Sequence, residues 1–290
     1  MNKDRLFTHL PLVFFFILIE IFGLYVLSKF LTGSEIVPLG LGSTSSDSYG
    51  IFDLILSFVF MIFIVLLLMK MQVVRIFRFW FLIVSILTSG ITLSIFFADT
   101  SQGTLIAFSM ALVLSSLKVF RPSVISHNLT EFLIYPGIAV LLVPFLNIPT
   151  TFALIFVICV YDIYAVWHSK LMQNMAKYQL EKVRVFSGIL LPQFINSKGF
   201  FNPFKKDKKK KKMAVALLGG GDIIFPLLLA GVLIKSGFVD YAMFSIVGAM
   251  LGLLYLILRS EKGKFYPAMP FIFVGNLVGL SIPYIYSVLL

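Results

Sequence analysis

Two aspartates, Asp162 and Asp222, each lie within a long apolar stretch of the chain. An ionisable side chain at membrane depth is energetically costly, so each is a candidate functional residue. Asp162 follows Tyr161, and Asp222 follows three consecutive glycines, Gly219, Gly220 and Gly221. Two carboxylates in contact repel each other when both are ionised, so such a pair is expected to hold one proton. The ionised member can then take a proton from water while the other polarises a carbonyl group, which predicts water-activating acid–base chemistry.

The composition is that of a polytopic membrane protein. Of the 290 residues, 59% are hydrophobic and only 13% are charged, whereas soluble domains have about 25% charged residues. We therefore expect one membrane domain over residues 1–290. The net charge is +11, but half of the 24 basic residues lie between Lys170 and Lys212, in one loop. Membrane topology and anionic lipid explain this cluster, so no nucleic-acid partner is expected.

Nine apolar stretches approach the roughly 20 residues that a membrane-spanning helix needs. They cover residues 10–30, 51–69, 79–97, 103–120, 132–148, 150–167, 213–234, 238–258 and 268–290. This predicts an all-α membrane protein with spans 1–6 within 10–168, a basic loop at 169–212 and spans 7–9 within 213–290. The more apolar part of that loop, Phe186 to Phe204, is interpreted as a lid, an interfacial segment or an ordinary loop.

The distribution of lysine and arginine predicts the orientation of these spans. Only Lys29 and Lys235 fall on one side of the membrane, and the other 22 basic residues fall on the other side. Cytoplasmic loops are enriched in basic residues, so the N-terminus and the 169–212 loop are expected in the cytoplasm. An odd number of spans then places the C-terminus outside.

The spacing predicts that the two carboxylates can meet. Asp162 lies about six residues before the cytoplasmic end of its span, and Asp222 about nine residues after the start of the next, which correspond to depths of roughly 9 and 14 Å. The glycines before Asp222 are expected to admit a close backbone and to weaken the helix. Tyr161 could donate a hydrogen bond, line the cavity or serve packing alone.

A third motif, Pro267-Ala268-Met269-Pro270, opens the last span. Its prolines predict an extended segment with free carbonyl groups. Taken together, Tyr-Asp, Gly-x-Gly-Asp and Pro-Ala-x-Pro on spans six, seven and nine resemble the motifs of the presenilin and signal peptide peptidase family. These proteins are the GxGD intramembrane aspartyl proteases.

The resemblance implies that Asp162 and Asp222 are the catalytic pair. It also implies that Pro267, Ala268 and Met269 occupy the PAL motif of the family, which shapes the active site and helps to hold the substrate. Gly219 and Gly221 fall in the glycine motif. The family has leucine where this chain has Met269, a swap of similar volume that we expect to be tolerated.

Family resemblance further implies single-span transmembrane substrates, which unwind and pair as a strand near the third motif. It implies no metal, no cofactor and no obligatory accessory subunit. The orientation derived from charge fits the presenilin branch. The short chain and the lack of an endoplasmic-reticulum retention signal suggest a prokaryotic, archaeal homologue in the cell membrane.

Two other functions are compatible with the sequence. A prepilin-type peptidase also uses a GxGD aspartate but has fewer spans and no Pro-Ala-x-Pro segment. A proton-coupled transporter could use Glu20, Asp162 and Asp222 as a relay, although Glu20 could equally face a wet groove or pair with a basic side chain. Two Gly-x-x-x-Gly patterns, at Gly248 and Gly275, predict helix-packing faces.

Overall fold

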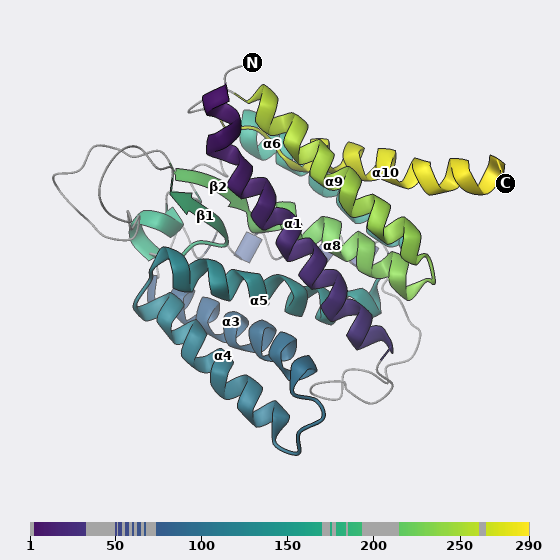
Figure 1. The fold of residues 1–290 in the computed structure, drawn as a ribbon. Coiled ribbons are helices and arrows are strands. Elements are labelled where there is room, and N and C mark those ends of the chain that lie inside the picture. The colour runs from purple at the N-terminus through teal and green to yellow at the C-terminus, as the bar shows by residue number, and fades with distance from the viewer. Residues whose placement is uncertain are drawn as a thin grey trace.

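The computed structural model describes residues 3–32, 74–169, 178–183, 185–192, 215–260 and 265–289, with isolated positions at 50, 52–53, 56–57, 60, 63–64, 67 and 175. Within these residues the chain forms long helices and one short antiparallel hairpin (Figure 1). The α-helices are α1 (Lys3–Thr32), α3 (Val74–Phe96), α4 (Gly103–Phe120), α5 (Val124–Leu142), α6 (Ile148–Trp167), α8 (Gly220–Lys235), α9 (Val239–Arg259) and α10 (Met269–Leu289). The hairpin strands are β1 (Gly188–Pro192) and β2 (Val215–Gly219).

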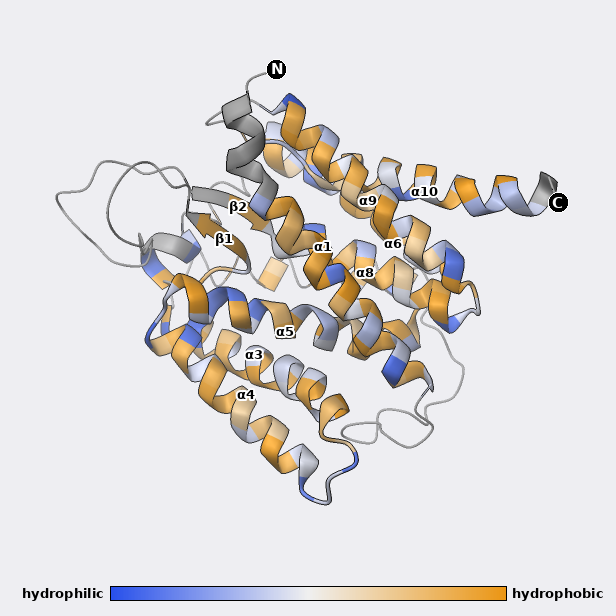
Figure 2. Ribbon diagram, in the orientation of Figure 1, coloured by the Kyte–Doolittle hydropathy of each residue, from blue (hydrophilic) through white to orange (hydrophobic). Residues whose placement is uncertain are grey.

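The helices form two groups joined by α1 and α8. Helix α3 packs against α4 and α5 on one side, and α9 packs against α10 on the other (Figure 1). Helix α8 contacts α1, α5, α6 and α9, so the helix that carries Asp222 lies between the groups. Hydrophobic residues dominate the helices (Figure 2). Seven of the described helices are long and apolar enough to cross a membrane, and α8, with 16 residues, is not among them.

Eight of the nine predicted spans have a helical counterpart among the described residues. The predicted span 103–120 coincides with α4, and the span 150–167 differs from α6 by two residues at its start. Helix α5 begins eight residues earlier than the predicted start at 132, because a capping box of Ser123 and Ser126 satisfies its first amides. The predicted span 51–69 lies largely outside the described residues, so the count of nine remains a prediction.

The predicted start of the seventh span is wrong. Residues Val215–Gly219 form strand β2 instead of helix, and α8 begins only at Gly220. The strand pairs with β1, which lies within the segment Phe186 to Phe204, interpreted above as a lid or loop. Short apolar runs suit a strand as well as a buried helix, and the pairing partner decides between them. The all-α class therefore holds except for this hairpin, and residues 193–204 of the segment lie outside the described part.

The two predicted glycine faces are confirmed. Gly248 and Gly252 of α9 lie directly against the backbone of α10 at Gly275 and Phe271, and Gly279 of α10 lies against Phe244 of α9. A Cβ atom at any of these glycines would collide with a backbone carbonyl group of the opposite helix. Small residues allow helix backbones this close in a membrane, where apolar burial gives little drive for association.

Candidate active site

Asp162 lies near the C-terminal end of α6, and its side chain is buried. The start of α6 is fixed by a capping box in which Asn147 and Thr150 exchange hydrogen bonds with each other's backbone. The amide N–H of Met269 donates to Oδ2 of Asp162 at 3.1 Å. The Asp162 side chain of the Tyr-Asp motif is thus bonded to the backbone of the Pro-Ala-x-Pro motif, 107 residues further along the chain.

The third motif offers this amide because a helix begins there. Residues 265–268 are not helical, and α10 starts at Met269, so the Met269 N–H has no intrahelical partner. Pro267 and Ala268 are both buried and lie outside any helix, but the Ala268 carbonyl is not free as expected, because it accepts a hydrogen bond from the Ile272 N–H at 3.1 Å. The backbone of Ala268 also lies within hydrogen-bonding reach of the Asp162 carboxylate. Two consecutive backbone groups thus orient Asp162.

Asp222 occupies the first turn of α8 and is buried. The free amides and the dipole of a helix N-terminus favour a carboxylate at this position. The backbone of Gly219, at the end of β2, lies within hydrogen-bonding reach of it. Asp162 and Asp222 are close enough to interact electrostatically, and both interact with the buried thiol of Cys159.

The three glycines form a junction between β2 and α8, and not a helical face as predicted. Gly219 ends the strand with extended backbone, and Gly220 and Gly221 begin the helix. Gly220 leaves little room for a side chain, since a Cβ atom would lie 3.1 Å from Oγ of Ser187 and 3.3 Å from Oη of Tyr135. The atoms closest to Gly220 therefore belong to side chains, and not to the neighbouring backbone that the glycines predict.

The hairpin fixes the direction of the backbone groups beside Asp222. The Gly220 N–H donates to the Ser187 carbonyl at 3.3 Å, and β1 and β2 continue this antiparallel register. Bonded and non-bonded pairs alternate in such a ladder. The N–H and C=O groups of Leu218 and Ala216 therefore face β1, whereas those of Gly219, Leu217 and Val215 point to the opposite edge of β2.

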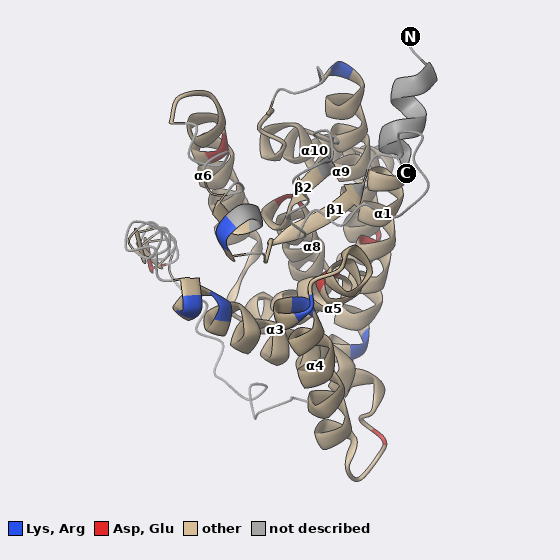
Figure 3. Ribbon diagram, turned by 90° about the vertical axis from the view of Figure 1, so that its left-hand side faces the viewer, with Lys and Arg blue, Asp and Glu red and all other residues tan. Residues whose placement is uncertain are grey.

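Tyr161 and Glu20, two other residues singled out from the sequence, differ from each other in their surroundings. Tyr161 is half-buried and interacts electrostatically with Asp162, its neighbour in sequence. Glu20 on α1 is fully buried, and neither of its carboxyl oxygens has a hydrogen-bond partner among the described residues. The expected wet groove or basic partner of Glu20 is therefore not found there. In Figure 3 the acidic residues of the described part lie on several separate helices.

Sequence reasoning missed the hairpin and the residues that hold it. His127 and Asn128 of α5 bond the backbone of β1. At Asn128 the sequence shows a glycosylation-like Asn-Leu-Thr pattern. A more informative signal was available, because His127, Asn128 and Glu131 place three strongly polar side chains just before the predicted membrane span 132–148.

Comparison with known proteins decides the family. The model of the family described as signal-peptide peptidase, presenilin aspartyl protease matches residues 13–289. The chain belongs to this family. The structure is also similar to two crystal forms of a presenilin family intramembrane aspartate protease, in space groups P2 and C222. The TM-scores are 0.61 and 0.62, the sequence identity is 15% in both cases, and 96–98% of each chain is covered.

These structures establish that the fold of this presenilin family member is presenilin-like. No curated protein matches the chain. The family is described as one of aspartyl proteases, and the two similar structures are of an intramembrane aspartate protease. Both findings agree with the resemblance found from the three motifs. The apolar helices likewise make the chain an integral, multi-pass membrane protein.

Proposed function

We propose that this chain is an intramembrane aspartyl endopeptidase that cleaves single-span transmembrane substrates with Asp162 and Asp222. One observation carries the proposal. Asp162 is bonded to the Met269 amide while it also interacts with Asp222, so motifs from three different helices converge on one buried pair of carboxyl groups. Such convergence of titratable groups with backbone donors is the pattern expected of a catalytic site.

In the proposed mechanism the two carboxyl groups share one proton. The ionised carboxylate removes a proton from a water molecule, and the protonated group donates to the carbonyl oxygen of the scissile peptide. Attack of the water gives a tetrahedral diol without a covalent intermediate. Proton transfer to the leaving nitrogen then breaks the C–N bond. The backbone of Ala268 and Met269 keeps Asp162 oriented during these transfers.

The substrate is proposed to bind as an extended strand on the outer edge of β2. A transmembrane helix hides its peptide bonds in hydrogen bonds, so a segment must unwind before water can attack. The groups of Leu217 that point away from β1 would replace lost hydrogen bonds by strand addition. Because Gly219 lies three residues before Asp222, a strand on this edge would run toward the carboxylate. Tyr161, Gly221 and Pro267 would then shape the cavity around the peptide.

The proposed topology keeps the prediction from charge. Residues 1–290 form one membrane domain of nine spans, with the N-terminus and the 169–212 loop in the cytoplasm and the C-terminus outside. We place the protein in a prokaryotic cell membrane, acting on substrates in the surrounding lipid without an obligatory accessory subunit, a metal or a cofactor. The two other functions considered from sequence gain no support, since the family and the fold are those of presenilins.

The proposal is tested by cleavage of a model single-span peptide in liposomes. We expect Asp162→Asn and Asp222→Asn each to abolish cleavage, because either change removes an essential proton donor or acceptor while preserving shape. Asp240→Asn is the matched control, because Asp240 also lies in the first turn of a helix but is exposed. Cleavage retained by either active-site variant would remove that residue from the mechanism.

A further inference from the structure

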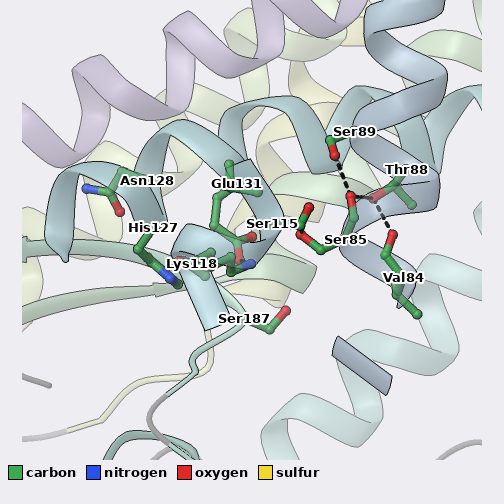
Figure 4. Close-up of polar contacts among 12 residues, drawn as sticks. Val84, Ser85, Thr88, Ser89, Ser115, Lys118, His127, Asn128, Glu131 and Ser187 are labelled. Atoms are coloured by element: carbon green, nitrogen blue, oxygen red, sulfur yellow. Dashed lines mark hydrogen bonds and ion pairs between the residues drawn. The ribbon is translucent and has the colours of Figure 1, made fainter. Parts of the chain in front are cut away.

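Two buried side chains of α5 bond the strand β1 along its outer edge. The amide group of Asn128 donates to the Leu190 carbonyl at 2.8 Å and accepts from the Leu190 N–H at 3.1 Å. His127 donates through Nε2–H to the Gly188 carbonyl at 2.7 Å. His127 is fully buried, and Asn128 is only 9% exposed. Figure 4 shows the two residues next to each other on α5, at the strands of the hairpin.

The bonds from Asn128 reproduce those of a neighbouring strand. A carboxamide carries one C=O and one NH₂ group, and so it can bond both backbone groups of one residue as a paired peptide would. Leu190 is a residue whose N–H and C=O groups point away from β2, because the bonded pairs are Ile189 with Leu218 and Leu191 with Ala216. Asn128 therefore closes the outer edge of β1 at Leu190.

Further polar contacts hold this face of α5 in place. Glu131, one turn after His127, forms a buried ion pair with Lys118 of α4, and both side chains are 2% exposed. His127 interacts electrostatically with both members of this pair. The Leu133 carbonyl of α5 accepts a hydrogen bond from Thr92 of α3 at 2.7 Å. The donors that reach β1 thus stand on a helix that is fixed to two others.

We propose that His127 and Asn128 are positioning residues that fix the register of the hairpin against Asp222 and direct the substrate to β2. The inference rests on the proposed function. β2 continues without a break into the first turn of α8, so the bonds that hold β1 also hold the strand that leads to Asp222. If β1 slips, β2 loses its fixed partner, and the bound strand can shift along β2. We expect a shift of two residues, because side chains on the same face of a strand recur at every second residue.

The test combines product analysis with hydrogen exchange on the full-length protein. A single-span peptide in liposomes is cleaved, and the masses of its products give the cleavage positions. The wild-type protein is expected to cut mainly at one position. Asn128→Ala is expected to lower the cleavage rate at least tenfold and to add products offset by two residues. Amide exchange over residues 185–192 is expected to become at least tenfold faster.

A pair of variants at His127 separates positioning from simple packing. His127→Phe keeps a buried ring but loses the donor, so it should give the shifted products. His127→Gln keeps an N–H donor, so it should retain the wild-type cleavage position. Asn276→Ala is the matched control, because it removes a buried amide on α10 whose oxygen bonds Ser245 of α9. It should leave both the products and the exchange at 185–192 unchanged.

Each outcome decides between the proposals. An active wild-type protein whose Asn128→Ala and His127→Phe variants keep slow exchange and one cleavage position overturns the inference while the proposed function stands. A wild-type protein that cuts no peptide contradicts the proposed function, and the exchange data still test the bond between α5 and β1. If Asn128→Ala does not fold, His127→Phe carries the same prediction, with His127→Gln as its control.

Discussion

Backbones meet directly where α9 crosses α10, whereas polar side chains hold the backbone where α5 meets the hairpin. In the first region glycines allow the two helices to touch, and α10 then presents the Met269 amide to Asp162. In the second region His127 and Asn128 bond β1, and the Lys118–Glu131 pair holds α5 to α4. The glycine contact sets a fixed distance between helices, while the polar contact sets the direction of individual backbone groups. The proposed active site needs both.

The largest effect is expected from breaking the buried ion pair of the polar region. Lys118→Met leaves Glu131 buried without its partner, and such a loss costs about 3–5 kcal/mol. The double variant Lys118→Met/Glu131→Leu removes both charges and is expected to recover most of the stability. Thermal and denaturant unfolding of the purified protein in detergent measures both. Equal destabilisation by the single and double variants would show that the charge imbalance is not the cause.

Breaking the glycine region is expected to have the next largest effect. Gly248→Leu inserts a side chain where a Cβ atom already collides with the Gly275 carbonyl, so the two helices must separate. Overpacking of this kind costs about 1–3 kcal/mol or more. It should also move the Met269 amide from Asp162 and reduce cleavage. Val247→Leu, on the exposed side of the same helix, is the control and should leave the unfolding temperature unchanged.

A smaller effect should follow from loosening α5 without touching the hairpin. Thr92→Val removes the hydrogen bond to the Leu133 carbonyl while keeping the shape of the side chain. The loss of one buried hydrogen bond is expected to cost about 1 kcal/mol. Unfolding in detergent measures it. A cost indistinguishable from zero would show that α5 is held by its other contacts alone.

The smallest effect is expected from the polar bond within the glycine region. Ser245→Ala removes the hydrogen bond to Asn276 at 3.1 Å, and we expect a loss of about 0.6 kcal/mol, the average measured for such bonds between membrane helices. A loss as large as that of Gly248→Leu would contradict the comparison, because the polar bond would then matter as much as the glycine contact.

The sequence predicted the family and most helices because each signal was local. Apolar stretches long enough for a span gave eight helical segments, and three short motifs indicated the two aspartates and the third-motif backbone. The Gly-x-x-x-Gly patterns correctly predicted the contact between α9 and α10. Each of these features depends on residues near one another in the chain.

The hairpin could not be predicted in the same way. β1 and β2 are five-residue apolar segments separated by a basic stretch, and only their mutual pairing makes them strands. The bonds from Asn128 to Leu190 span 62 positions, and no local pattern encodes them. The start of α8 was misplaced for the same reason, because the apolar run before Asp222 is compatible with helix until β1 is known.

The two-aspartate mechanism is tested most directly by cleavage of a single-span peptide in liposomes. The proteins compared are the wild type and the variants Asp162→Asn, Asp222→Asn and Asp240→Asn. The wild type and Asp240→Asn are expected to cleave the peptide, whereas the other two variants are expected to remain folded and to cleave none. Cleavage by either of those two variants at the wild-type rate would contradict the two-aspartate mechanism.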